Sequence, residues 1–145
     1  MFVCCIVKPS AQHLCTEIRS ALTIVGLPIL CEKEVTYTAA LVDVLYDHMS
    51  REARTMIAQR YGGCTGTALL LYASSIEACL AVCGKESDPR ACTLESIRGR
   101  YGSRGDFECL GDWPWWENAI HRPVDERERA RDVSLFFPEY AEGAG

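Results

Sequence analysis

The sequence predicts a fold that combines α-helices with a sheet of four β-strands. Short apolar or alternating runs, typical of strands, alternate along the 145 residues with segments in which apolar side chains recur at helical spacing. The 48% hydrophobic content is sufficient for one buried core in a chain of this length. The sequence has no internal repeat and no low-complexity tract. This pattern leaves parallel and antiparallel arrangements of the strands both open.

The N-terminal half of the chain carries clear periodicities. An apolar run that stops at Lys8-Pro9 is typical of a buried strand ending at a proline. A segment of helical period follows, with Ser10 as a candidate cap and Gly26 as the stop. An alternating segment then indicates a strand at the edge of the sheet. The expected elements are a strand at 2–7, a helix at 10–25, a strand at 28–35, and helices at 38–49 and 50–61.

The C-terminal half contains a buried strand, a long loop and a capped helix. The continuous apolar run TALLLYA indicates a central strand covered on both faces. No period is evident between Lys85 and Glu117, and a stretch of that length is typical of a functional loop. Asp125 followed by Glu128 forms a candidate capping box. The expected elements are a strand at 67–73, a helix from Ser74 or Ser75 to Cys83, a strand at 118–121, and a helix that begins at Asp125 and ends before Pro138.

Charge and cysteine content limit the classes of partner. A net charge of −5 provides no general basic surface, so we expect no nucleic-acid binding, although a local basic site for a small anion is compatible with it. No apolar run is long enough to span a bilayer. The nine cysteines are odd in number and lack C-x-x-C spacing, which favours reduced, mostly buried thiols in a cytoplasmic compartment. We expect no metal site, because Cys79 and Cys83 have no histidine nearby to complete one.

Three basic residues stand at the ends of separate expected elements. Lys8 follows the first strand, Arg98 lies in SIRGRYG and His121 ends NAIH. A lysine, an arginine and a histidine so placed can converge on one anion, with the histidine as nucleophile. Each also has a simpler interpretation: Lys8 could merely end a strand, Arg98 could form an ordinary surface ion pair, and His121 could be a hydrogen-bonded structural residue. His13 and His48 lie in helical patterns, and we expect neither to have a functional role.

The order of several motifs resembles the nucleoside diphosphate kinase family. These motifs are IVKPSA, GTALLLY, CGKESDP, SIRGRYG, NAIH and VSLFFPEY, and SIRGRYG and FFPEY are closer to the divergent second group of the family than to its housekeeping enzymes. The resemblance implies an α+β, ferredoxin-like βαββαβ fold whose four-stranded antiparallel sheet is covered by helices, with a long inserted loop before the last strand. We expect one such domain at 1–140 and a disordered tail at 141–145.

The resemblance also implies a reaction and the residues that perform it. The γ-phosphate of a nucleoside triphosphate would pass to a nucleoside diphosphate through a phosphohistidine, in a ping-pong reaction with Mg²⁺ bound through the phosphates. The implied catalytic residues are His121 as nucleophile, Lys8 on phosphate and sugar hydroxyl, Tyr46 beside the histidine, and Asp132 as the carboxylate that orients the imidazole. The implied nucleotide-binding residues are Lys8, Arg98 on the terminal phosphates, Asn118 on the ribose hydroxyl, Ser87 on phosphate and Met56 against the base.

The sequence departs from the family pattern at several of these positions. Leu80 stands where the family has a second phosphate-binding arginine, and Arg122-Pro123 replaces a glycine and a serine. Asp132 is one methylene shorter than the family's glutamate. Arg122 adds positive charge that could partly replace the missing arginine. Three assignments have rivals: Arg104 of RGDF for Arg98, Glu86 for Ser87, and Thr55 for Met56.

The inserted loop contains three tryptophans, Trp113, Trp115 and Trp116. They could cover the nucleotide pocket, bind a protein partner or pack against the protein itself. With Leu80 and Pro123, this insertion favours an alternative function, a catalytically weak or inactive nucleotide-binding or protein-interaction module that retains the kinase fold. The resemblance further implies a homo-oligomer, with nucleoside tri- and diphosphates as ligands.

Overall fold

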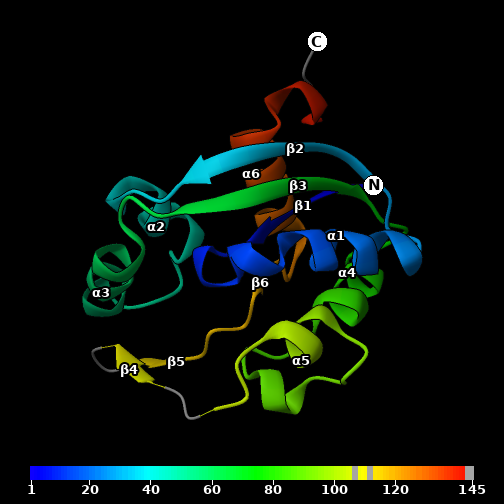
Figure 1. Ribbon diagram of the computed structural model, residues 1–145. Coiled ribbons are helices and arrows are strands. Elements are labelled where there is room, and N and C mark those ends of the chain that lie inside the picture. Colours follow the sequence, from blue (N-terminus) through cyan, green and yellow to red (C-terminus); the bar gives the residue numbers. More distant parts are fainter. Residues whose placement is uncertain (106–107, 111–112, 143–145) are drawn as a thin grey trace.

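The computed structural model, which describes residues 1–105, 108–110 and 113–142, has an α+β fold built on a four-stranded sheet (Figure 1). The strands lie in the order β2-β3-β1-β6, and every neighbouring pair is antiparallel. This is the ferredoxin-like arrangement that the resemblance implied, so the antiparallel alternative is confirmed. The strands are β1 (Phe2–Val7), β2 (Ile29–Thr36), β3 (Thr65–Tyr72) and β6 (Ile120–His121).

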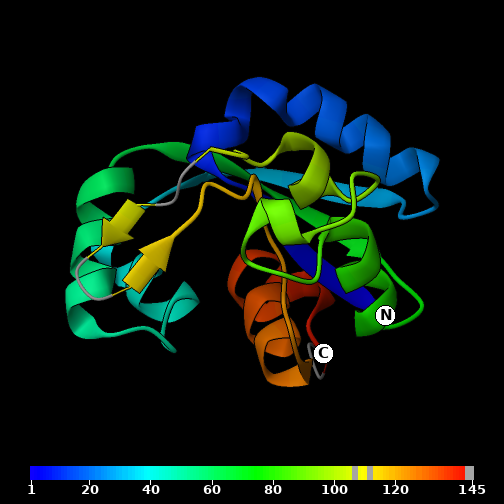
Figure 2. The same ribbon diagram turned by 90° about the horizontal axis from the view of Figure 1, so that it is seen from below.

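Helices cover both faces of the sheet and create two apolar cores (Figure 2). Successive residues of a strand point to opposite faces, so Cys4 and Ile6 of β1 belong to one core, and Cys5 and Val7 to the other. The first core also contains residues of α2, α3 and α6, and the second contains residues of α1, α4 and α5. These helices are α1 (Cys15–Ile24), α2 (Ala39–Leu45), α3 (Arg51–Tyr61), α4 (Ile76–Cys83), α5 (Ile97–Tyr101) and α6 (Glu126–Phe136).

Most of the expected helix starts are confirmed. Ser50, Ser75 and Asp125 each accept a hydrogen bond from the backbone N–H three residues further on. The helix expected from Ser10 is an exception, because the chain first forms a 3₁₀ helix, η1 (Pro9–Leu14), and becomes α-helical at Cys15. The Ser10 hydroxyl does not cap a helix, since it donates instead to the carboxylate of Glu117 at 2.7 Å.

The segment expected to be one structureless loop, residues 85–117, contains short regular elements. They are the 3₁₀ helix η2 (Pro89–Ala91), helix α5 and a hairpin of β4 (Glu108–Leu110) and β5 (Trp113–Trp115). Leu110 and Trp115 of this hairpin are buried in the same core as α3. Elements of three to five residues are too short to establish a period, which explains why the sequence pattern missed them.

Three smaller expectations have mixed outcomes. All nine cysteines are free thiols, but only Cys4, Cys5, Cys79 and Cys83 are buried, so the expectation that most would be buried was wrong. Within the described ranges, no helix combines the length and apolar character needed to cross a membrane. Of the tail expected to be disordered, Glu142 forms an ion pair with Arg129 at 3.1 Å after the short 3₁₀ helix η3 (Pro138–Tyr140), while residues 143–145 lie outside the described residues.

Candidate active site

A cleft of about 490 Å³ lies where β1 and β6 end, next to α2, α5 and the β4–β5 hairpin. Figure 2 shows these elements from below, with the hairpin beside α3. The cleft brings together residues that are distant in the sequence. Its lining includes most of the site residues expected from the sequence, namely Lys8, Tyr46, Ser87, Arg98, Asn118 and His121.

An unusual turn directs the last strand into the cleft. Ala119 has a positive φ of 72°, and the N–H of Ile120 donates to the carbonyl of Asn118 at 2.9 Å, which together define a strained γ-turn. The turn separates Asn118 from His121, and both side chains line the cleft. Pairing of His121 with Ile6 then fixes the histidine beside β1. The spacing N-x-x-H therefore corresponds to one turn with a side chain that lines the cleft on each side of it.

His121 is held by the buried carboxylate of Asp132, which lies behind it on α6. Nε2 of His121 donates to Oδ2 of Asp132 at 2.8 Å, and the carboxylate is fully buried. Burial alone would raise the pKa of Asp132, but the hydrogen bond and charge of His121, with the contact from Arg131, outweigh it and lower the pKa. An ionised Asp132 keeps the proton of neutral His121 on Nε2, so Nδ1 carries the free lone pair that a nucleophile needs.

Arg131 is a member of the site that the sequence did not reveal. Its Nε donates to Oδ1 of Asp132 at 2.8 Å, so each carboxylate oxygen has one partner, and its Nη1 donates to the carbonyl of Val44 at 3.0 Å. Pro123 stands where the resemblance implies a serine, so it offers no hydroxyl to the carboxylate of Asp132. Arg131 supplies the second hydrogen-bond partner of that carboxylate instead. Neighbouring residues on a helix do not normally face each other, so periodicity gives no indication of this contact.

Lys8 is buried at the floor of the cleft, with only 3% of its surface exposed. Its ammonium nitrogen lies 4.7 Å from the centre of the Trp115 ring and 5.9 Å from that of Tyr46. Burial, together with the positive charges of Arg98 and Arg122, lowers the pKa of Lys8 to about 7, although Glu117 acts in the opposite direction. An anionic ligand would favour the charged form of this lysine.

Two buried arginines supply further positive charge. The guanidinium of Arg98 donates to the carbonyls of Ile120 and Glu86, and that of Arg122 donates to the carbonyls of Gly84 and Lys85. Gly84 is required here because its φ is 116° and an added Cβ would lie 2.7 Å from Cβ of Arg98. Burial lowers the pKa of Arg98 to about 10, but both guanidinium groups remain charged at neutral pH. The cleft therefore concentrates cations in a protein with net negative charge.

Two buried polar atoms of the cleft have no hydrogen-bond partner among the described residues. They are the hydroxyl of Tyr46 and Oδ1 of Asn118. The other atom of the Asn118 amide, Nδ2, donates to the carbonyl of Ser87 at 3.0 Å, which fixes the orientation of Oδ1 as an acceptor. Unsatisfied buried polar groups are rare in folded proteins and indicate a ligand or an ordered water. A ligand with hydroxyl groups and anionic oxygens would match this site.

Some expected residues lie elsewhere, and some unexpected ones line the cleft. Met56 lies on α3 and packs against the first apolar core, and neither it nor Leu80 is among the described residues that line the cleft. Arg104 donates to the carbonyl of Gly99 at 3.1 Å and does not line it either. Trp113, Trp115 and Trp116 do line it, as does His48, which we expected to have no functional role.

Comparisons with known proteins identify relatives of one kind. Residues 3–141 match the family model described as nucleoside diphosphate kinase. A nucleoside-diphosphate kinase from Borrelia burgdorferi, solved as a transition-state mimic with bound vanadate and ADP, is 19% identical over 94% of this chain and 86% of its own, with a TM-score of 0.76. An NDP kinase from Pyrobaculum aerophilum is 16% identical over 97% of this chain and 98% of its own, also with a TM-score of 0.76. Identities this low show a common fold alone. No curated protein is a significant sequence match.

Proposed function

The chain belongs to the nucleoside diphosphate kinase family, and on this basis we propose that it transfers the γ-phosphate of a nucleoside triphosphate to a nucleoside diphosphate through a phosphohistidine at His121. The observation that carries the proposal is the hydrogen bond of 2.8 Å between His121 and Asp132, in a cleft that also contains buried cations. The carboxylate leaves Nδ1 unprotonated and faces the positive charge that develops on the ring during attack.

The proposed reaction has two similar halves. In the first, Nδ1 of His121 attacks the γ-phosphorus in line, so an N–P bond forms while the bond from phosphorus to the β-phosphate oxygen breaks and the diphosphate leaves. In the second, a phosphate oxygen of a new diphosphate attacks the phosphohistidine and restores free His121. Lys8, Arg98 and Arg122 would neutralise charge on the transferred group in both halves. One site therefore serves both substrates in a ping-pong sequence.

Recognition of the nucleotide would rest on its sugar and phosphates. Oδ1 of Asn118 can accept a hydrogen bond from a ribose hydroxyl, and the Tyr46 hydroxyl and Ser87 can reach phosphate oxygens. Magnesium would enter with the nucleotide and bridge its phosphates as part of the substrate. The position of Met56 does not support the base contact expected of it, whereas Trp113 in the cleft wall offers a ring face for stacking.

One observation favours the alternative of a nucleotide-binding module with little or no turnover. The Trp115 ring lies directly over the ammonium group of Lys8, the lysine that would contact the transferred phosphate. If this contact persists when nucleotide binds, the phosphate would be held away from His121. Calorimetry of nucleotide binding, carried out beside the labelling experiment described next, separates the two functions.

The test is a two-step labelling experiment with purified protein. After incubation with γ-labelled ATP and magnesium, we expect an acid-labile, alkali-stable phosphoryl adduct that disappears when a nucleoside diphosphate is added. His121→Asn should form no adduct, whereas the matched control His48→Asn, which alters the other histidine of the cleft, should form it normally. Nucleotide binding without an adduct in the wild-type protein would refute the kinase proposal and favour the alternative. Homo-oligomerisation, which the resemblance implies, remains a prediction for the same preparation.

A further inference from the structure

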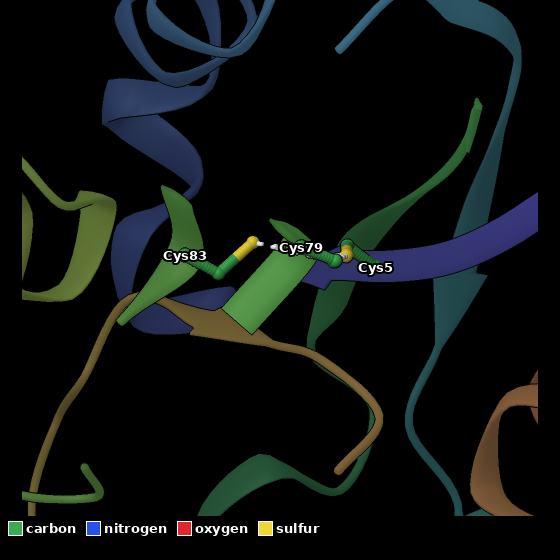
Figure 3. A group of neighbouring side chains, drawn as sticks. All are labelled: Cys5, Cys79 and Cys83. Atoms are coloured by element: carbon green, nitrogen blue, oxygen red, sulfur yellow. Dashed lines mark hydrogen bonds between the residues drawn. The ribbon is translucent and has the colours of Figure 1, made fainter. Parts of the chain in front are cut away.

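Three buried cysteines converge behind the cleft, on the side of the sheet that α4 covers (Figure 3). Cys5 comes from β1, and Cys79 and Cys83 lie one turn apart on α4. Their Sγ atoms are 3.7 Å apart for Cys5 and Cys79, 3.9 Å for Cys5 and Cys83, and 4.0 Å for Cys79 and Cys83. All three residues are fully buried. The sequence showed the helical pair but not the third cysteine, which is 74 residues from Cys79.

The triangle of sulfur atoms has the dimensions of a metal site. The point equidistant from the three Sγ atoms lies about 2.2 Å from each, close to the ~2.3 Å of a zinc–thiolate bond. The three sulfurs come from two different elements and lie at nearly equal separations, so a single ion at this point would be within bonding distance of all three. Among the described residues, these three cysteines form the one group of three or more histidine, cysteine, aspartate or glutamate side chains that could hold a metal ion.

The number and type of ligands select the ion. Zinc in structural sites is almost always bound by four ligands, and no histidine, carboxylate or further cysteine of the described residues joins this group. Thiolates are soft ligands that favour copper(I). A three-sulfur, fully buried site without a fourth ligand matches a monovalent soft cation that accepts trigonal coordination. We propose that Cys5, Cys79 and Cys83 form a three-coordinate thiolate site for copper(I).

The surroundings of the cluster are compatible with the negative charge of such a site. Arg122 supplies positive charge beside the cluster, because its guanidinium donates to the carbonyl of Gly84, the residue that follows Cys83. Binding exchanges the S–H bonds of the three cysteines for copper–sulfur bonds and releases the protons to solvent, with no change of oxidation state. Because the sulfurs are buried, the ion must enter while α4 is displaced or while the chain folds.

The site also connects to the cleft through α4. This helix ends at Cys83, and the carbonyl of the next residue, Gly84, accepts a hydrogen bond from Arg122 at 3.0 Å. An ion bound to two residues of α4 and one of β1 would fix the helix against the sheet, and with it the carbonyl that positions Arg122. The inference concerns a separate site and does not depend on kinase activity.

The test refolds reduced protein without oxygen in the presence of copper(I) and a competing copper(I) chelator, and then removes the chelator complex. We expect one copper ion per chain, with X-ray absorption showing three sulfur ligands at about 2.2–2.3 Å. The Cys64→Ser/Cys109→Ser variant, which lacks the two exposed thiols, should retain this ion. Cys79→Ser should reduce the affinity at least about 100-fold.

Two results on copper retention would overturn the proposal. One is a wild-type protein that retains no copper against the chelator. The other is copper that is lost in Cys64→Ser/Cys109→Ser but kept in Cys79→Ser, which would place the ion at surface thiols. Circular dichroism checks that each variant is folded, and Cys83→Ala serves in place of Cys79→Ser if that variant is not. If both fail to fold, the sulfur count in Cys64→Ser/Cys109→Ser still decides, since any number other than three contradicts the site.

Discussion

Replacing Lys8 by methionine should stabilise the protein at pH 6 while weakening its binding of nucleotide. Methionine has a similar length but no charge, so it removes the ammonium group from a position where 3% of the residue is exposed. Among the described residues, the groups that act on this ammonium group include two ring faces and two cations, with Glu117 as an opposing carboxylate. Bound phosphates would compensate its charge, which explains why a site with this function would retain a destabilising lysine.

The size of the effect follows from the pKa of Lys8. Burial first, and then Arg98 and Arg122, lower it from 10.5 to about 7 in the folded protein. Between these values the unfolded chain binds more protons than the folded one, so stability rises with pH, and below pH 7 the penalty is fully present. At about 1.4 kcal/mol per pKa unit, the penalty is about 5 kcal/mol, of which about 2–3 kcal/mol is relieved by pH 9.

Urea unfolding of the wild type and Lys8→Met at pH 6 and pH 9 measures this difference. We expect the variant to be more stable by several kcal/mol at pH 6, with the gap narrowing by about 2–3 kcal/mol at pH 9. Groups that titrate in both proteins cancel in the comparison. Lys85→Met is the matched control, because it removes a lysine of the same cleft that is exposed instead of buried. A gap for Lys8→Met that does not change between pH 6 and pH 9 would refute the argument that burial holds the pKa of Lys8 down.

Two further predictions concern the chemistry of the cleft. Asp132→Asn should slow formation of the phosphohistidine by about 10²–10⁴-fold in single-turnover measurements with little change in nucleotide affinity, because an amide can leave the proton of His121 on Nδ1; an unchanged rate would show that the carboxylate does not set the tautomer. Arg122→Gln should weaken nucleotide binding about 10–100-fold by calorimetry, since a charged hydrogen bond contributes about 1.5–3 kcal/mol. The control Arg127→Gln changes an arginine at the cleft whose side chain is 60% exposed, and a loss of equal size there would show that only general charge matters.

The fold could be predicted from the sequence because its signals are local and agree with one another. Apolar runs located β1 and β3, and capping residues located the starts of α3, α4 and α6. The order of strands required the resemblance, since periodicity does not say which strands are neighbours. The start of α1 was missed because Ser10 had a stronger partner, Glu117, from the far end of the chain. A helix start predicted from local sequence is wrong where the capping side chain instead bonds to a residue distant in the sequence.

The site was predicted to the extent that motifs mark it. Lys8, Arg98, Asn118 and His121 follow recognisable motifs, and the structure brings all of them to one cleft. The contact of Arg131 with Asp132 has no such marker, because it depends on the carbonyl of Val44 in α2, which accepts a hydrogen bond from the other end of the guanidinium. Cys5 was missed for the same reason. A single sequence shows which residues share an element but not which elements meet.

The position of Arg122 explains how the cleft is cationic although Leu80 stands where the resemblance implies a second arginine. Leu80 lies on α4, outside the lining of the cleft, whereas Arg122 follows His121 directly and reaches back to the carbonyls of Gly84 and Lys85, just beyond the end of that helix. Compared with the pattern that the resemblance implies, the positive charge lies directly after β6, the strand of the proposed nucleophile His121, and not on α4, while remaining next to the same loop. Since electrostatic stabilisation of a phosphoryl group depends on where charge lies and not on which element provides it, loss of the arginine at Leu80 does not by itself argue against catalysis.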